Sequence, residues 1–100
     1  MYFICFIAAA ALLFSCSPGA KPNLQGNVYP AGNGFGYTIK ANGKLLIKQS
    51  VIPAVSGNHP FCDSIDAAKV CDKVMEKIKQ RKAPYITPEE LKQLKIKTKC

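Results

Sequence analysis

The sequence FGYTIKANGKLLIKQ, residues 35–49, is the clearest structural signal in the chain. Apolar and polar residues alternate on both sides of an Asn-Gly pair, which is the pattern of two half-buried strands joined by a tight turn. A two-residue turn would pair Lys40 with Leu45 and mix charged and apolar side chains on one face. A three-residue loop with Gly43 in the left-handed region pairs Ile39 with Leu45 and leaves one face apolar. The sequence therefore predicts a hairpin with a three-residue loop.

The predicted register places Lys40, Lys44 and Lys48 on the opposite face of the hairpin. The whole chain carries 14 Lys and Arg against 6 Asp and Glu, a net charge of +8. Such a balance favours anionic partners such as lipid head groups, polyanionic glycans or nucleic acid. No aromatic residues interleave with the lysines, which argues against nucleic acid. The lysine face is therefore a candidate contact surface for polyanions or anionic membranes, with a solvated sheet face as the plain alternative.

Two helices are predicted after the hairpin. Apolar residues recur at helical spacing from Ser64 onward, and we expect Ser64 to cap this helix and the helix to end before Pro84. The run Thr-Pro-Glu-Glu that begins at Thr87 has the pattern of a capping box with proline at the first helical position. The order predicts a small single-domain α+β fold, a β-hairpin packed against one long helix plus a short C-terminal helix.

Upstream of the hairpin, residues 16–34 are rich in proline, glycine and asparagine and show no apolar period. This composition is typical of a linker. We therefore expect a flexible tether over residues 16–34 and a small basic α+β domain over residues 35–100.

Residues 1–15, MYFICFIAAAALLFS, are apolar almost throughout and carry no charge. The run is shorter than the ~20 residues that a membrane-spanning helix needs, and it has the length of a signal-peptide core. Leu13-Phe14-Ser15-Cys16 resembles the lipobox of bacterial lipoproteins, in which the cysteine is lipidated. The resemblance implies a signal peptide over 1–15, a membrane anchor at Cys16 and a place in the cell envelope, at the outer membrane facing the periplasm. An ordinary cleaved signal peptide is the alternative.

A wider resemblance extends over residues 35–96. The positions that carry it are Gly36-Tyr37, Asn42-Gly43-Lys44, Ile47, Gln49, Ile52-Pro53-Ala54, Gly57, Phe61, Asp66-Ala67, Lys77, Pro84 and Leu91. Together they are similar to domain of unknown function 4907, a family of small Bacteroidota envelope proteins. The resemblance implies a secreted or lipid-anchored protein without an established activity, so no functional residues carry over. Cys62 and Cys71 depart from the family pattern.

Three cysteines lie in the predicted domain: Cys62, Cys71 and Cys100. Cys71 falls on the apolar stripe of the long helix, where we expect a buried core residue. If the chain is helical between them, Cys62 and Cys71 lie about 13 Å apart, beyond the reach of a disulfide. A Cys62–Cys100 disulfide is therefore the candidate pairing, and free or intermolecular thiols are the alternative.

Catalytic chemistry finds little support in the sequence. His59 and Cys62 form the only closely spaced pair of metal-binding type, whereas zinc needs four converging groups. We expect no metal, no cofactor and no catalytic residues, since the carboxylates lie beside lysines as caps and surface pairs. The sequence thus predicts a non-catalytic envelope lipoprotein that acts as a binding or accessory module, with another envelope protein as a candidate partner. A polyanion or anionic-membrane-surface binder is the alternative.

Overall fold

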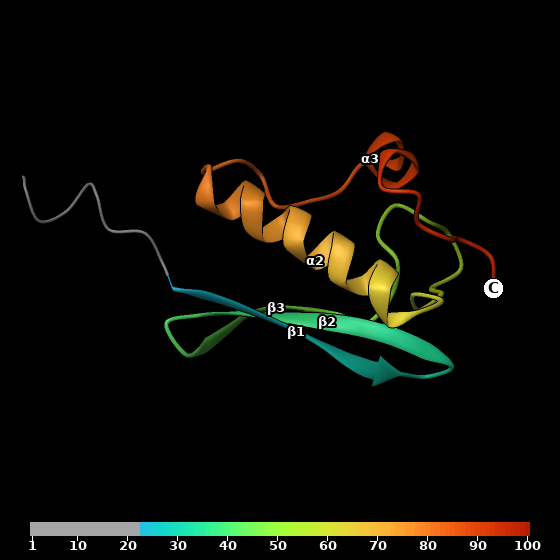
Figure 1. Cartoon of the computed structure of the whole chain (residues 1–100), viewed down its shortest axis with the longest axis horizontal. Helices are drawn as coiled ribbons and strands as arrows, with labels where there is room; N and C mark the ends of the chain where they lie inside the picture. Colours follow the sequence, from blue (N-terminus) through green and yellow to red (C-terminus); the bar gives the residue numbers. More distant parts are fainter. Residues whose placement is uncertain (1–22) are drawn as a thin grey trace, which may run out of the picture.

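The computed structural model describes residues 23–100. The predicted signal peptide, residues 1–15, and the predicted lipidation site at Cys16 lie outside the described residues. A three-stranded antiparallel sheet forms one layer, and the helices lie together on one of its faces (Figure 1). The elements are β1 (Leu24–Ala31), β2 (Gly34–Ala41), β3 (Lys44–Gln49), α2 (Ser64–Lys79) and α3 (Pro88–Gln93). The predicted α+β class, with one long helix and a short C-terminal helix, is confirmed.

The first strand corrects the predicted tether. Leu24–Ala31 pairs along its whole length with β2, so the ordered domain begins well before residue 35. Proline is tolerated in β1 because β1 is an edge strand. Gly26 faces α2, and a Cβ there would lie 2.6 Å from the Sγ of Cys71. The glycine that suggested a linker is therefore required by close packing between strand and helix.

The turn between β2 and β3 also differs from the prediction. Asn42 and Gly43 have φ of 52° and 83°, and a type I′ two-residue turn requires positive φ at both positions. Lys40 accordingly pairs with Leu45 beside the turn. The predicted three-residue loop was wrong.

A β-bulge restores the apolar face that the loop was expected to provide. Ile39 pairs with Ile47, so Leu46 is the extra residue on β3. A bulge shifts the alternation of the strand by one residue, and Ile47 takes the core-facing place opposite Ile39 that had been predicted for Leu45. Alternation alone could not distinguish a longer loop from a short turn followed by a bulge.

The N-cap of helix α2 lies one residue before the predicted N-cap. Asp63, not Ser64, is the N-cap, and its Oδ1 accepts a hydrogen bond from the backbone N–H of Asp66 at 2.8 Å. Asp63 has the extended backbone that a cap needs, and aspartate caps as well as serine does. The helix ends at Lys79, before Pro84 as predicted.

The core lies between the sheet and the helical layer. Phe61, in the loop before α2, extends the sheet, because its backbone exchanges hydrogen bonds of 3.0 and 2.9 Å with Phe35. The capping box of α3 is confirmed, with Thr87 and Glu90 each accepting the other's backbone N–H. The buried apolar residues are Tyr37, Ile39, Ile52, Phe61, Ala67, Val70, Cys71, Val74, Ile86, Leu91 and Ile96.

Candidate functional site

The candidate site at the β2–β3 hairpin consists of Lys40, Lys44, Leu45, Leu46 and Lys48, which we call the hairpin surface. All five side chains are exposed. Lys40 pairs with Leu45, and Lys48 lies farther along the same outward face. The predicted single array of three lysines is split, however, because Lys44 pairs next to the turn with a residue of the core-facing side.

The two leucines are the part of this surface that the sequence did not predict. Leu45 is 58% exposed and Leu46 is 52% exposed. The predicted register had placed Leu45 in the core, whereas the short turn directs it outward and the bulge leaves Leu46 outside the regular pairing. The hairpin surface therefore combines apolar and cationic side chains, which is the composition of surfaces that lie in a membrane interface.

The carboxylate side chains are confined to the helical layer. Residues 23–62 include Lys40, Lys44 and Lys48 but no aspartate or glutamate, and every carboxylate side chain of the chain falls within residues 63–90. Lys48 also lies over the ring of Tyr29, 5.5 Å from its centroid. The sheet layer thus presents positive charge that no neighbouring carboxylate of the same layer neutralises.

The chain enters the domain beside the hairpin turn. The backbone N–H of Asn23 donates to Oδ1 of Asn42 at 3.1 Å, and the backbone N–H of Asn42 donates to the carbonyl of Asn23 at 3.0 Å. The first residue of β1, Leu24, pairs with Ala41, the last residue of β2. We call this the entry end of the sheet.

The C-terminal end of α2 lies at the entry end as well (Figure 1). Gly26 of β1 lies against Cys71 and Met75, and the helix continues past them for one more turn. The chain then exposes Arg81 and Lys82. Strand β2, strand β3 and the C-terminal end of α2 therefore bring cationic residues to the same end of the molecule.

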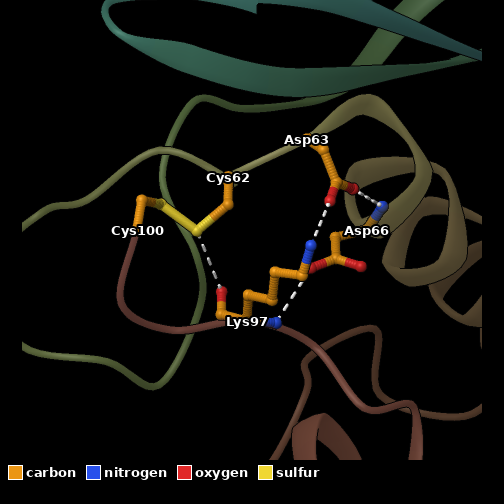
Figure 2. The surroundings of a disulfide bond; sticks show 5 residues. All are labelled: Cys62, Asp63, Asp66, Lys97 and Cys100. Carbon is orange, nitrogen blue, oxygen red and sulfur yellow. Dashed lines mark hydrogen bonds and ion pairs between the residues drawn. A yellow bond between two sulfur atoms is a disulfide. The ribbon is translucent and has the colours of Figure 1, made fainter.

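A disulfide between Cys62 and Cys100 lies near the start of α2, with 5.6 Å between the Cα atoms (Figure 2). The backbone N–H of Lys97 donates to Oδ2 of the buried Asp66 at 2.8 Å, and Nζ of Lys97 lies 3.2 Å from Oδ2 of Asp63. The hydrogen bond from the backbone of Asp66, helped by Lys97, lowers the pKa of Asp63. These contacts fasten the C-terminal tail to the start of the helix.

A shallow cavity of about 350 Å³ adjoins the disulfide. His59 lies in its wall, and no aspartate, glutamate or free thiol lines it. Among residues 23–100, no three histidine, cysteine or carboxylate side chains converge as a metal site would need. The lining residues are Asn33, Gly34, His59, Pro60, Phe61, Thr98, Lys99 and Cys100.

Three further reactive side chains, Cys71, Tyr37 and Glu90, are buried or have structural partners. Cys71 is in the core, as predicted, and burial raises its pKa to about 11. Burial likewise raises the pKa of Tyr37. Glu90 accepts a hydrogen bond of 2.7 Å from Nζ of Lys77, and this bond, together with one from the backbone of Thr87, lowers the pKa of Glu90 to about 2. The thiol is thus protonated at neutral pH, and the carboxylate is occupied by the helix cap.

These features define a small, disulfide-linked α+β domain with a cationic and apolar hairpin surface. The profile of the family described as Domain of unknown function (DUF4907) matches residues 27–93, and the chain belongs to that family. The match begins inside β1, which agrees with β1 being part of the domain. No curated protein and no solved structure matches the chain. Within residues 23–100, none of the helices is long and apolar enough to cross a membrane.

Proposed function

We propose that this chain is a lipid-anchored protein of the bacterial cell envelope whose domain is a non-catalytic binding or accessory module. The observation that supports this address is the disulfide between Cys62 and Cys100, because disulfides persist in oxidising compartments outside the cytoplasm. A signal peptide over residues 1–15 and a lipid on Cys16 agree with it. The anchor would hold the domain at the outer membrane, facing the periplasm, where another envelope protein is the expected partner.

The proposal of a non-catalytic role rests on how the reactive side chains are used. Cys62 and Cys100 are joined to each other, and Cys71 is buried with a raised pKa. Asp66 holds the backbone of the tail, and Glu90 completes a helix cap. A nucleophile or a general base needs to be accessible and poised near the working pH, and these five groups are committed to structure instead.

The intact mass of the protein, purified in detergent from its native membranes, tests the anchor. We expect the mass of residues 16–100 plus a diacylglyceryl group and an acyl chain. Alkylation of the unfolded chain should modify Cys71 alone before reduction, and Cys62 and Cys100 as well after it. A mass without lipid, or one that retains residues 1–15, would contradict the proposed address.

A second candidate function is contact with an anionic surface through Lys40, Lys44 and Lys48. It is favoured by the absence of any carboxylate side chain from residues 23–62. Retention on heparin or on anionic vesicles should fall with rising salt, because such contacts are screened. The triple Lys→Glu variant at these positions should lose the retention. A matched control makes the same charge change at Lys92, Lys95 and Lys99, and equal losses in both variants would show that only net charge matters.

A further inference from the structure

We propose that the hairpin surface is a membrane-docking element, in which Leu45 and Leu46 enter the head-group region of an anionic bilayer while the lysines contact lipid phosphates. For its orientation this inference rests on the proposed lipid anchor at Cys16. It deepens that proposal by naming the occupant of the hairpin surface and the end of the domain that lies against the membrane.

The first argument is the exposure of the two leucines. Adjacent leucines that are each more than half exposed present apolar area whose removal from water is favourable. Lys40 pairs with Leu45 and Lys48 lies on the same face, while Lys44 precedes Leu45 beside the turn. Apolar side chains bordered by lysines match a bilayer interface, which offers acyl chains beneath a layer of phosphates. A soluble polyanionic glycan would match the lysines but not the leucines.

The second argument is the path of the chain. Seven residues, 17–23, separate Cys16 from the first residue of β1, and they can span at most about 25 Å. The backbone of Asn23 is hydrogen bonded to Asn42, in the turn of the hairpin itself. A lipid on Cys16 would therefore hold the entry end close to the bilayer, and with it the hairpin surface.

The third argument is the distribution of charge along α2. Asp63 and Asp66 lie at its start, beside the disulfide, whereas Lys79, Arg81 and Lys82 follow at its end. That basic end lies at the entry end of the sheet (Figure 1). An anionic membrane would attract this basic end more strongly than the start of the helix, where Lys97 is paired with Asp63. The disulfide and the cavity beside it would then face away from the membrane.

A single introduced tryptophan can test this docking, because the chain contains none of its own. The full-length chain from native membranes, carrying Leu46→Trp, is reconstituted into vesicles of phosphatidylcholine alone or of phosphatidylcholine mixed with phosphatidylglycerol. Both vesicles hold a lipid anchor, so any difference between them reports the domain. We expect the emission to move to shorter wavelength on the phosphatidylglycerol vesicles. Asn33→Trp, in the β1–β2 turn at the other end of the sheet, is the matched control and should not shift.

A double variant separates the bilayer from other occupants. In a chain made with Cys16→Ser, which has no lipid to bind the vesicles by itself, Leu45→Asn/Leu46→Asn should weaken binding to added phosphatidylglycerol vesicles about tenfold or more and leave retention on heparin unchanged. If the double variant binds vesicles as the native chain does, a polyanion rather than a bilayer occupies the surface. A native chain that dimerises in detergent, and loses the dimer in the double variant, would instead assign the leucines to a second copy.

The outcomes distinguish this inference from the proposed anchor. A lipid-bearing chain whose Leu46→Trp emission is the same on both vesicles keeps the anchor and overturns the docking. A chain without lipid overturns the anchor, and the emission of Leu46→Trp on added phosphatidylglycerol vesicles then decides the docking by itself.

Discussion

Gly34 lies where the sheet meets the loop that precedes α2. A Cβ at this position would overlap the carbonyl oxygen of Phe61, whose backbone is paired with Phe35. We expect Gly34→Ala to lower the free energy of unfolding by about 3 kcal/mol, because backbone atoms can relieve the overlap only by giving up those hydrogen bonds. Urea unfolding followed by circular dichroism measures the change.

Gly32, in the same turn, provides the control. It has a φ of 56°, and a Cβ there would meet no atom within 4 Å. Gly32→Ala should therefore cost only the ~1 kcal/mol of a left-handed alanine. Equal losses at Gly32 and Gly34 would show that turn conformation, and not the contact with Phe61, is what requires Gly34.

The carboxylate of Glu90 makes part of the stability depend on pH. Its pKa is lowered to about 2 from an ordinary value of 4.5, chiefly by the hydrogen bond from Lys77 and then by the one from the backbone of Thr87. Because the folded-state pKa is the lower one, the contribution is complete above about pH 4.5 and is lost as the pH falls towards 2.

Glu90→Gln isolates this effect, since glutamine can still accept the N–H of Thr87 but carries no charge. At neutral pH we expect the variant to unfold about 1 kcal/mol more easily than the native chain. Thermal unfolding across the acid range should show the two chains converging as the pH falls towards 2. A difference that stays constant would mean that the charge of Glu90 contributes nothing.

At the scale of the elements, α2 ends in a Schellman motif with an unusual residue. The backbone N–H groups of Arg81 and Lys82 donate to the carbonyls of Ile78 and Lys77, at 3.0 and 2.8 Å. Arg81 has a φ of 59°, in the region where glycine is the usual residue. Arg81→Gly should therefore stabilise the domain by about 1 kcal/mol in chemical denaturation.

Arg81→Lys keeps both the charge and the Cβ, so it should show no such gain. If the helix end docks on the membrane as proposed, then in a chain without the lipid (Cys16→Ser) Arg81→Gly should also bind phosphatidylglycerol vesicles more weakly than Arg81→Lys. Arg81 would then lower the stability of the helix end while adding positive charge at the entry end. A destabilised Arg81→Gly variant would show that the side chain of Arg81 contributes packing at this helix end.

The elements differ in how far the sequence could predict them. The two helices and the capping box at Thr87 depend on neighbouring residues, and their patterns were sufficient. Strand β1 depends on distant residues, because Gly26 is explained by its contact with Cys71 and Met75 on α2. The register of the hairpin was missed for a related reason. The apolar face can be restored by a longer loop or by a bulge at Leu46, and the local alternation allows both.

At the scale of the whole molecule, the site combines features that are separate in the sequence. The lysines of the hairpin could be named from alternation and charge. Their position beside Asn23, where the chain enters, follows only from the pairing of β1 with β2. The Cys62–Cys100 pairing was a candidate because helical spacing excluded Cys71. The bond from Lys97 to the buried Asp66, by contrast, joins residues 31 positions apart and depends on the completed fold.

The disulfide links the loop before α2 to the C-terminal residue and encloses both helices in one covalent loop. It joins residues separated by 38 positions, and a loop of that length corresponds to about 4 kcal/mol of stabilisation in the chain-entropy account. Domains of this size have only about 5–10 kcal/mol in total. We therefore expect Cys100→Ser to lower the free energy of unfolding in urea by about 4 kcal/mol.

Cys62→Ser should cost the same as Cys100→Ser, and the double variant no more than either, since both remove one bond. Reduction of the native chain should reproduce the loss. A loss below about 1 kcal/mol would mean that the Asp66–Lys97 bond and the buried Ile96 hold the tail without the disulfide. The expected loss would leave the reduced domain only marginally folded, so the domain would need oxidising conditions such as those of the proposed envelope address.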